Sequence, residues 1–188
     1  MNRIPVRLFI LSLTTTLAAV VAPVPAQAAP YCGITWGSTG KSADAYDAEV
    51  INDVRAGRHA CFDRLVIDIG GEDTTFGSYD VRYVDRVYSE AKGDPVPVRG
   101  AADLQIVVRA PAYDAEYRST YTPRNPREVV NVSGYSTFRQ VAWGGSFEAQ
   151  TTIALGVRAR LPIRVFTLPG TPASDHTPRL VLDVAHRW

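Results

Sequence analysis

Beyond its first fifty residues, the chain alternates hydrophobic and polar positions with a period of two rather than 3.6. Leu65, Ile67 and Ile69, for example, share one face of a segment whose other positions are mostly polar. Glycine and proline separate the alternating segments, which are 50–54, 62–69, 80–88, 104–109, 129–132, 137–143, 147–157, 163–168 and 180–185. We therefore predict an all-β fold of eight or nine strands, a β-sandwich of two mainly antiparallel sheets.

Glycines indicate where these strands turn or bend. Gly57 lies between the first two alternating segments and predicts a hairpin turn around itself. Gly144 and Gly145 adjoin each other between two later segments, where they predict a bulge or a tight bend. The fold would then consist largely of strands that are neighbours along the chain.

One hexamer occurs almost twice, as RLVIDI at 64–69 and as RLVLDV at 179–184. Similar aliphatic strands arise by chance, but the matched arginine and aspartate positions favour pseudo-symmetry. We expect the two copies to be equivalent strands in the two facing sheets, with their aliphatic side chains buried. Asp68 and Asp183 are expected to form ion pairs with arginines on neighbouring strands rather than a catalytic carboxylate pair.

The amino terminus has the three parts of a secretory signal peptide. Arg3 and Arg7 supply positive charge, an apolar run of about 15 residues follows, and Ala26-Gln27-Ala28 has the small-x-small form of a cleavage site. The run is too short to span a bilayer comfortably. We predict cleavage near Ala28 and a secreted or cell-wall-associated mature chain without a membrane span.

Charge and length restrict what the mature chain can be. The whole sequence of 188 residues has 20 basic and 19 acidic side chains. Loss of Arg3 and Arg7 with the signal peptide removes any net basic field that would attract nucleic acid. The length suits one domain. We divide the chain into a signal peptide (1–28), an N-terminal arm (29–49) and a β-sandwich domain (50–188).

Cys32 and Cys61 are the only cysteines. Export would place them in an oxidising compartment, so we predict a disulfide that tethers the N-terminal arm. A redox pair or a metal site is the alternative, but the cysteines do not form a CxxC motif and no histidine–cysteine cluster accompanies them. We predict no metal and no cofactor.

Four segments of the chain carry a resemblance to a known family: DVRAGRH at 53–59, FDRLVID at 62–68, YDVRYV at 79–84 and RLVLDV at 179–184. Together they resemble the AMIN-like domain of exported bacterial proteins. That domain is similar in strand pattern to the AMIN domain, a β-sandwich of cell-wall amidases and secretins that binds peptidoglycan. The resemblance implies a sandwich with peptidoglycan or envelope proteins as partners, and it brings no catalytic residues.

The segment 110–128 is long for a connection within a compact domain and combines tyrosines with arginines. Tyrosine rings stack on sugars, and the arginine fork binds carboxylates and phosphates. The candidate ligand-binding residues are Tyr113, Tyr117, Arg118, Tyr121 and Arg124. The alternative is that the tyrosines pack inward and hold the loop in place. The three tryptophans are interpreted as core or edge residues.

No motif predicts catalysis. The segment 35–42 resembles a phosphate-binding loop but has Thr35 where that motif needs glycine. None of His59, His176 and His186 adjoins a nucleophile-elbow motif. We expect a non-catalytic module that binds the cell envelope. Two alternatives stay open: a secreted hydrolase whose site is assembled from dispersed residues, and a protein-interaction domain that uses an exposed strand edge.

Overall fold

The computed structural model describes residues 29–45, 49–70, 75–171, 174 and 176–188, and the predicted signal peptide lies outside them. Strands account for nearly all of the regular structure, apart from one short 3-10 turn, η1 (Tyr31–Gly33). The strands are β1 (Lys41–Ala43), β2 (Val50–Arg58), β3 (Phe62–Gly70), β4 (Tyr79–Val84), β5 (Ala102–Val108), β6 (Phe138–Phe147), β7 (Gln150–Val157), β8 (Ile163–Leu168) and β9 (Arg179–Ala185).

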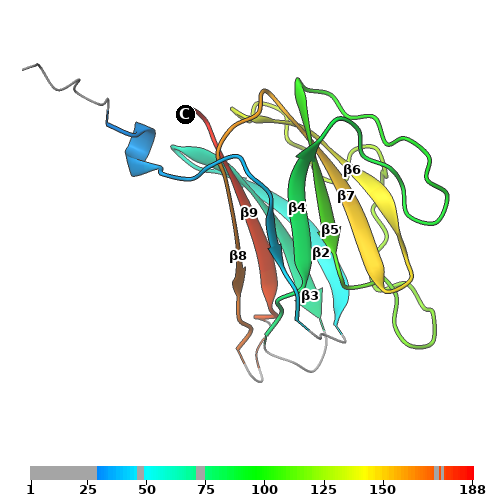
Figure 1. The fold of residues 1–188 in the computed structure, drawn as a ribbon. Helices are drawn as coiled ribbons and strands as arrows, with labels where there is room; N and C mark the ends of the chain where they lie inside the picture. Colours follow the sequence, from blue (N-terminus) through cyan, green and yellow to red (C-terminus); the bar gives the residue numbers. More distant parts are fainter. Residues whose placement is uncertain (1–28, 46–48, 71–74, 172–173, 175) are drawn as a thin grey trace, which may run out of the picture.

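The strands form two antiparallel sheets that face each other (Figure 1). One sheet has five strands in the order β1-β4-β5-β7-β6, and the other has four in the order β2-β3-β9-β8. The all-β prediction and the antiparallel pairing are therefore confirmed. No helix in the described part of the chain is long and apolar enough to cross a membrane.

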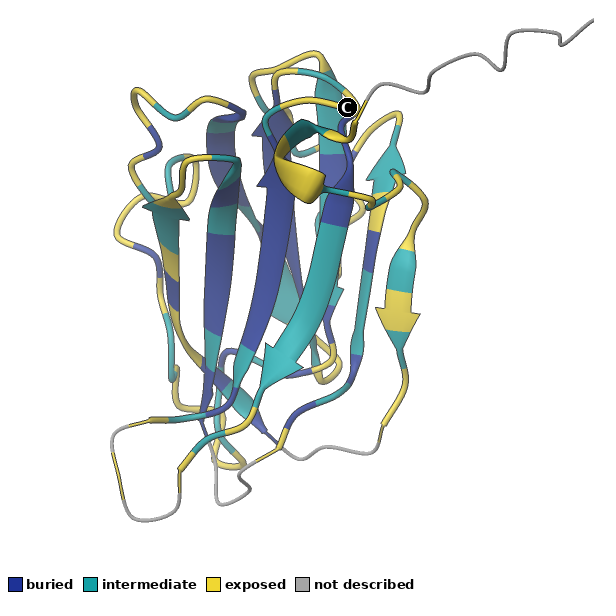
Figure 2. Cartoon of the chain, turned by 90° about the vertical axis from the view of Figure 1, so that its left-hand side faces the viewer, coloured by how far each residue is buried: buried dark blue, intermediate teal, exposed yellow. Residues whose placement is uncertain are grey.

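The alternating pattern builds the core between the sheets. Leu65, Ile67 and Ile69 of β3 are buried as predicted, and Leu104 and Ile106 of β5 are fully buried in the same cluster. Figure 2 shows the buried residues concentrated in the strands and the exposed ones in the loops and the arm. Burial of these aliphatic faces is the main favourable contribution to folding.

The two similar hexamers do not lie in facing sheets, so that prediction is wrong. They form β3 and β9, which are antiparallel neighbours in the four-stranded sheet. In this register Arg64 is opposite Asp183, and Asp68 is opposite Arg179. The repeat thus places each arginine of one strand across from an aspartate of the other, an arrangement that favours pairing of the two strands.

The turns also differ in part from the prediction. Gly57 lies within β2, opposite Arg64, and the chain turns at 59–61 instead. The Gly144-Gly145 pair does produce a bulge, but inside β6 rather than between two strands. The reversal from β6 to β7 occurs at Glu148 and Ala149, which both have positive φ.

The predicted strand at 129–132 is absent: these residues belong to the loop before β6. The amide of Val129 donates to the carbonyl of Val141 at 2.9 Å, and the amide of Trp143 donates to the carbonyl of Pro126 at 2.7 Å. The segment therefore contacts the edge of β6 at separated points without forming a ladder. Proline at 126 cannot donate a hydrogen bond, which limits regular pairing there.

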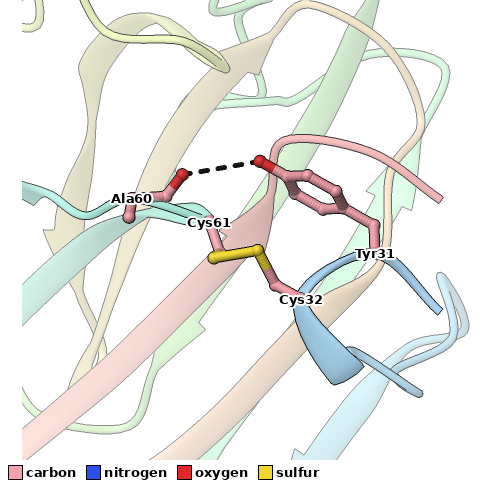
Figure 3. The surroundings of a disulfide bond; sticks show 4 residues. All are labelled: Tyr31, Cys32, Ala60 and Cys61. Carbon is pink, nitrogen blue, oxygen red and sulfur yellow. Dashed lines mark hydrogen bonds between the residues drawn. A yellow bond between two sulfur atoms is a disulfide. The ribbon is translucent and has the colours of Figure 1, made fainter.

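The arm is fixed at one end of the sandwich by the predicted disulfide between Cys32 and Cys61 (Figure 3). Beside it, the hydroxyl of Tyr31 donates to the carbonyl of Ala60 at 3.4 Å. The arm then passes the edge of β8, where the amide of Ile163 donates to the carbonyl of Gly37. It ends as β1, which pairs with β4 in the other sheet. The arm thus connects both sheets.

Candidate functional site

The loop of 109–137, which joins β5 to β6, begins at the end of the sandwich opposite the disulfide (Figure 1). Its first part is attached to the edge of the other sheet at Ile51. The amide of Ile51 donates to the carbonyl of Pro111 at 2.8 Å, and the hydroxyl of Thr120 donates to the carbonyl of Ile51 at 2.8 Å. These hydrogen bonds hold the part of the loop that carries the tyrosines against the edge of β2.

Tyr113 and Tyr117 stack on each other, with ring centroids 5.7 Å apart and an angle of 19° between the ring planes. The hydroxyl of Tyr113 accepts a hydrogen bond from the amide of Ala149, in the turn between β6 and β7, at 3.2 Å. Tyr117 has φ of 60° and is 84% exposed. A large apolar ring held in solvent by a fixed turn is a feature of binding surfaces.

Arg118 is engaged within its own turn. Its guanidinium donates to the carboxylates of Asp114 at 2.7 Å and of Glu116 at 2.8 Å. The Asp114 carboxylate also accepts from the backbone amides of Glu116 and Arg118. The hydrogen bond from the Arg118 amide is the main reason that the pKa of Asp114 is lowered. This network stabilises the turn that carries Tyr117, and it neutralises the charge of Arg118.

Tyr121 packs against Trp143 of β6, with ring centroids 5.4 Å apart, and both rings contact the edge of the core. Burial, together with the negative charge of Asp53, raises the pKa of Tyr121 to about 12. This tyrosine therefore combines a structural role with one face toward the surface. The alternative of tyrosines that pack inward fits Tyr121 far better than Tyr117.

The three predicted tyrosines line one hollow of about 340 Å³, which we call the aromatic hollow. Trp143 is the fourth aromatic residue in its wall. The other lining residues are small or polar, namely Ala112, Ser119, Thr122, Pro123 and Ser146. Arg118 and Arg124 are exposed and do not line this hollow. The structure thus brings the predicted tyrosines together and leaves the predicted arginines outside.

A second hollow of about 480 Å³ adjoins the aromatic hollow and shares Tyr113 and Tyr117 with it. Its wall is more polar and includes Arg109, Asp114 and Glu148. Arg109 forms an ion pair with Asp44 at 3.3 Å, although both side chains are more than half exposed. The stacked tyrosines therefore stand between an aromatic and a polar depression, an arrangement suited to an extended ligand with sugar rings and polar substituents.

An acid–histidine pair lies at the other end of the molecule. The ring of His186 is 3.1 Å from the carboxylate of Asp63, which is fully buried. The other oxygen of this carboxylate accepts from the amides of Thr137 and Phe138 at 2.6 and 3.1 Å. Within the described part of the chain, no hydroxyl or thiol is bonded to the His186 ring. The pair connects strands and lacks the nucleophile of a hydrolase triad.

No group of three or more metal-binding side chains converges among the residues that the structure describes. Asp68 and Asp183 form ion pairs with arginines of neighbouring strands, as predicted. Asp68 pairs with Arg55, and Asp183 pairs with Arg64 and Arg164.

Comparison with known families identifies the fold. The AMIN-like domain matches residues 49–186, and the chain therefore belongs to the AMIN-like domain family. The comparisons with curated proteins and with solved structures yield no match. The matched range contains the whole aromatic hollow but excludes the arm with Cys32.

Among the four aromatic residues of the hollow, Trp143 is the one that the sequence analysis did not select. It was interpreted as a core or edge residue, and it is indeed half-buried, but its ring also forms part of the hollow. Tyr121 and Trp143 are far apart along the chain, so only strand order brings them together. The bulge at Gly144 and Gly145, directly after Trp143, is the one local signal of irregular geometry at this position.

Proposed function

We propose that the protein is a secreted, non-catalytic module that binds peptidoglycan or another polymer of the cell envelope through the aromatic hollow. The observation that carries this proposal is the convergence of four aromatic rings in one hollow. Aromatic faces in a fixed, open depression suit the apolar faces of sugar rings. Membership in the AMIN-like family supports an envelope ligand.

Secretion is part of the same proposal. The signal-peptide pattern of 1–28 supports export, and the Cys32–Cys61 disulfide fits an oxidising compartment. A hydrolase receives less support, because Asp63 already binds two backbone amides and His186 has no bonded nucleophile in the described residues. Use of a strand edge also receives less support. Loop or arm carbonyls contact the edge strands β2, β6 and β8, and the fourth edge strand, β1, has only three residues.

Co-sedimentation with purified peptidoglycan from which anionic polymers have been removed tests this proposal. The wild-type protein should sediment. Tyr117→Ala should weaken binding about fivefold, since a stacked aromatic contact contributes about 1 kcal/mol. Replacement of Tyr113, Tyr117 and Tyr121 together by alanine should weaken it tenfold or more.

Tyr88→Ala is the matched control, because Tyr88 is, like Tyr117, an exposed tyrosine but does not line the aromatic hollow. It should bind within about twofold of the wild type, as surface substitutions away from a site have small effects. Melting curves of each variant separate lost binding from lost folding. A wild-type protein that stays in the supernatant would contradict the proposed function. A triple variant that binds normally would contradict the choice of the aromatic hollow.

A further inference from the structure

Arginines gather at the end of the sandwich that carries the disulfide, opposite the aromatic hollow. Arg58 ends β2, Arg158 follows β7, and Arg187 follows β9. All three side chains are exposed, and none forms an ion pair with a carboxylate among the described residues. We call this surface, defined by Arg58, Arg158 and Arg187, the arginine end.

Hydrogen bonds and ring contacts hold these elements together. The guanidinium of Arg158 donates to the carbonyl of His186, and the amide of His186 donates to the carbonyl of Cys61, at 2.9 Å. The guanidinium of Arg187 lies 5.4 Å from the ring centre of Tyr31, in the arm. The disulfide joins the arm to the turn that follows Arg58 (Figure 3). The three arginines therefore extend from a backbone that is cross-linked at several points.

The two fully buried carboxylates nearby are engaged by other groups. Asp183 lies between Arg64 and Arg164, with oxygen–nitrogen distances of 2.6 Å to each. Asp63 binds His186 and two backbone amides. Neither carboxylate pairs with any of the three residues that define the arginine end.

Arg160 is nearby, but acidic residues lie beside it. It lines a separate hollow with Asp85 and Asp103, so we do not count it as part of the arginine end. Its backbone carbonyl accepts a hydrogen bond from the indole of Trp188 at 3.1 Å, which holds this 66% exposed ring at the same end. The exposed arginines and the exposed ring of Trp188 therefore lie at the same end of the sandwich.

We propose that the arginine end binds a linear polymer with repeated phosphate groups, such as a phosphodiester-linked polymer of the cell wall. The arginines are spread over three elements rather than focused on one pocket, which suits several anionic groups along a chain better than one small anion. An anionic membrane is less suitable, because surface binding to lipid needs a larger exposed apolar area than one tryptophan provides. This proposal is independent of the aromatic hollow.

Long-chain inorganic polyphosphate, labelled for fluorescence anisotropy, is the probe for this proposal. The wild-type protein should bind it, with an affinity that falls as salt is added, because exposed ion pairs are screened over about 8–10 Å. Replacement of Arg58, Arg158 and Arg187 by glutamine should weaken binding about tenfold, given the usual strength of exposed ion pairs. Sedimentation with stripped peptidoglycan should not change.

The control carries the same loss of charge elsewhere: Arg55→Gln, Arg82→Gln and Lys92→Gln in one protein. Its affinity for polyphosphate should stay within about twofold of the wild type if binding is local. An equal loss in the control variant, or no binding by the wild type, would overturn the proposal. Tighter binding to duplex DNA or to anionic phospholipid vesicles than to polyphosphate would assign this surface to another partner and also overturn it.

Discussion

The two ends of the sandwich are built in different ways. At the end with the disulfide, contacts join residues far apart in sequence: Cys32 with Cys61, and Arg64 with Asp183. At the opposite end, the turn that carries Tyr117 is held by Arg118 and Asp114, four residues apart. The first end depends on the complete fold, whereas the second is a local turn on an edge of that fold. Substitutions should therefore reduce stability at the first end and mainly affect ligand binding at the second.

The largest effect is expected for Asp183→Ala. It removes the fully buried carboxylate that both Arg64 and Arg164 bind, and with it four charge-assisted hydrogen bonds, so the loss should be about 3–5 kcal/mol. Asp114→Ala, at the other end, should cost clearly less, because Arg118 is exposed and still has Glu116. Urea unfolding of both variants gives the comparison. Equal losses would contradict the distinction between the two ends.

Loss of the disulfide should come next. Cys61→Ser should lower the free energy of unfolding by about 3–4 kcal/mol, the chain-entropy value for a loop closed over a sequence separation of 29. The strands should still form, because seven of the nine strands, β3 to β9, lie outside the loop that the disulfide closes. Thermal unfolding followed by circular dichroism measures the loss. A variant without β-structure would show that the disulfide is needed for folding itself.

Tyr117→Ala should reduce stability by no more than about 1 kcal/mol, because the ring is largely in solvent. Only its stacking on Tyr113 is lost, while the bonds among Asp114, Glu116 and Arg118 remain. Chemical unfolding provides the measurement. A loss of several kcal/mol would mean that this ring holds the loop in place, and the variant would then be unsuitable as a test of binding.

The effect that is smallest at neutral pH concerns the ionisation of Tyr121. Because the pKa of Tyr121 is raised from 10.0 to about 12, the unfolded chain releases this proton before the folded chain does. Tyr121 should therefore have no effect on the pH dependence of stability below pH 10, and it should reduce stability as pH rises from 10 toward 12. Burial also raises the pKa values of Tyr79 and Tyr83, so ultraviolet titration should show a late phase from several tyrosines. Tyr121→Phe should reduce the amplitude of that phase by one tyrosine. A late phase of unchanged amplitude in that variant would contradict the assignment.

Local patterns were sufficient to predict much of the fold. Period-two alternation identified the buried faces of β3 and β5, and the count of cysteines together with the predicted export identified the disulfide. Strand pairing was harder to predict. The sequences of the two RLV hexamers do not indicate whether these strands lie in facing sheets or pair in one sheet. Alternation at 129–132 was misleading because a few apolar residues can also pack against an edge without forming a ladder.

Only part of the candidate site could be predicted from the sequence. Tyr113 and Tyr117 lie in one turn, so their proximity follows from sequence spacing. Trp143 lies beside them only because the loop before β6 passes along the edge of that strand. Local sequence patterns do not specify this path or the order of the strands. Arg118 was selected for its guanidinium fork and for its position among the tyrosines. Its partners Asp114 and Glu116 are visible in the sequence, but the turn that brings all three together is a property of the structure.

Sedimentation with two preparations of cell-wall sacculi tests the central claim that the two ends bind independently: one intact, and one stripped of phosphodiester-linked polymers. Tyr117→Ala should bind more weakly than the wild type to both preparations. The variant without Arg58, Arg158 and Arg187 should bind more weakly only to the intact sacculi. A wild-type protein that fails to sediment with either preparation, or two variants with the same pattern of loss, would contradict the account.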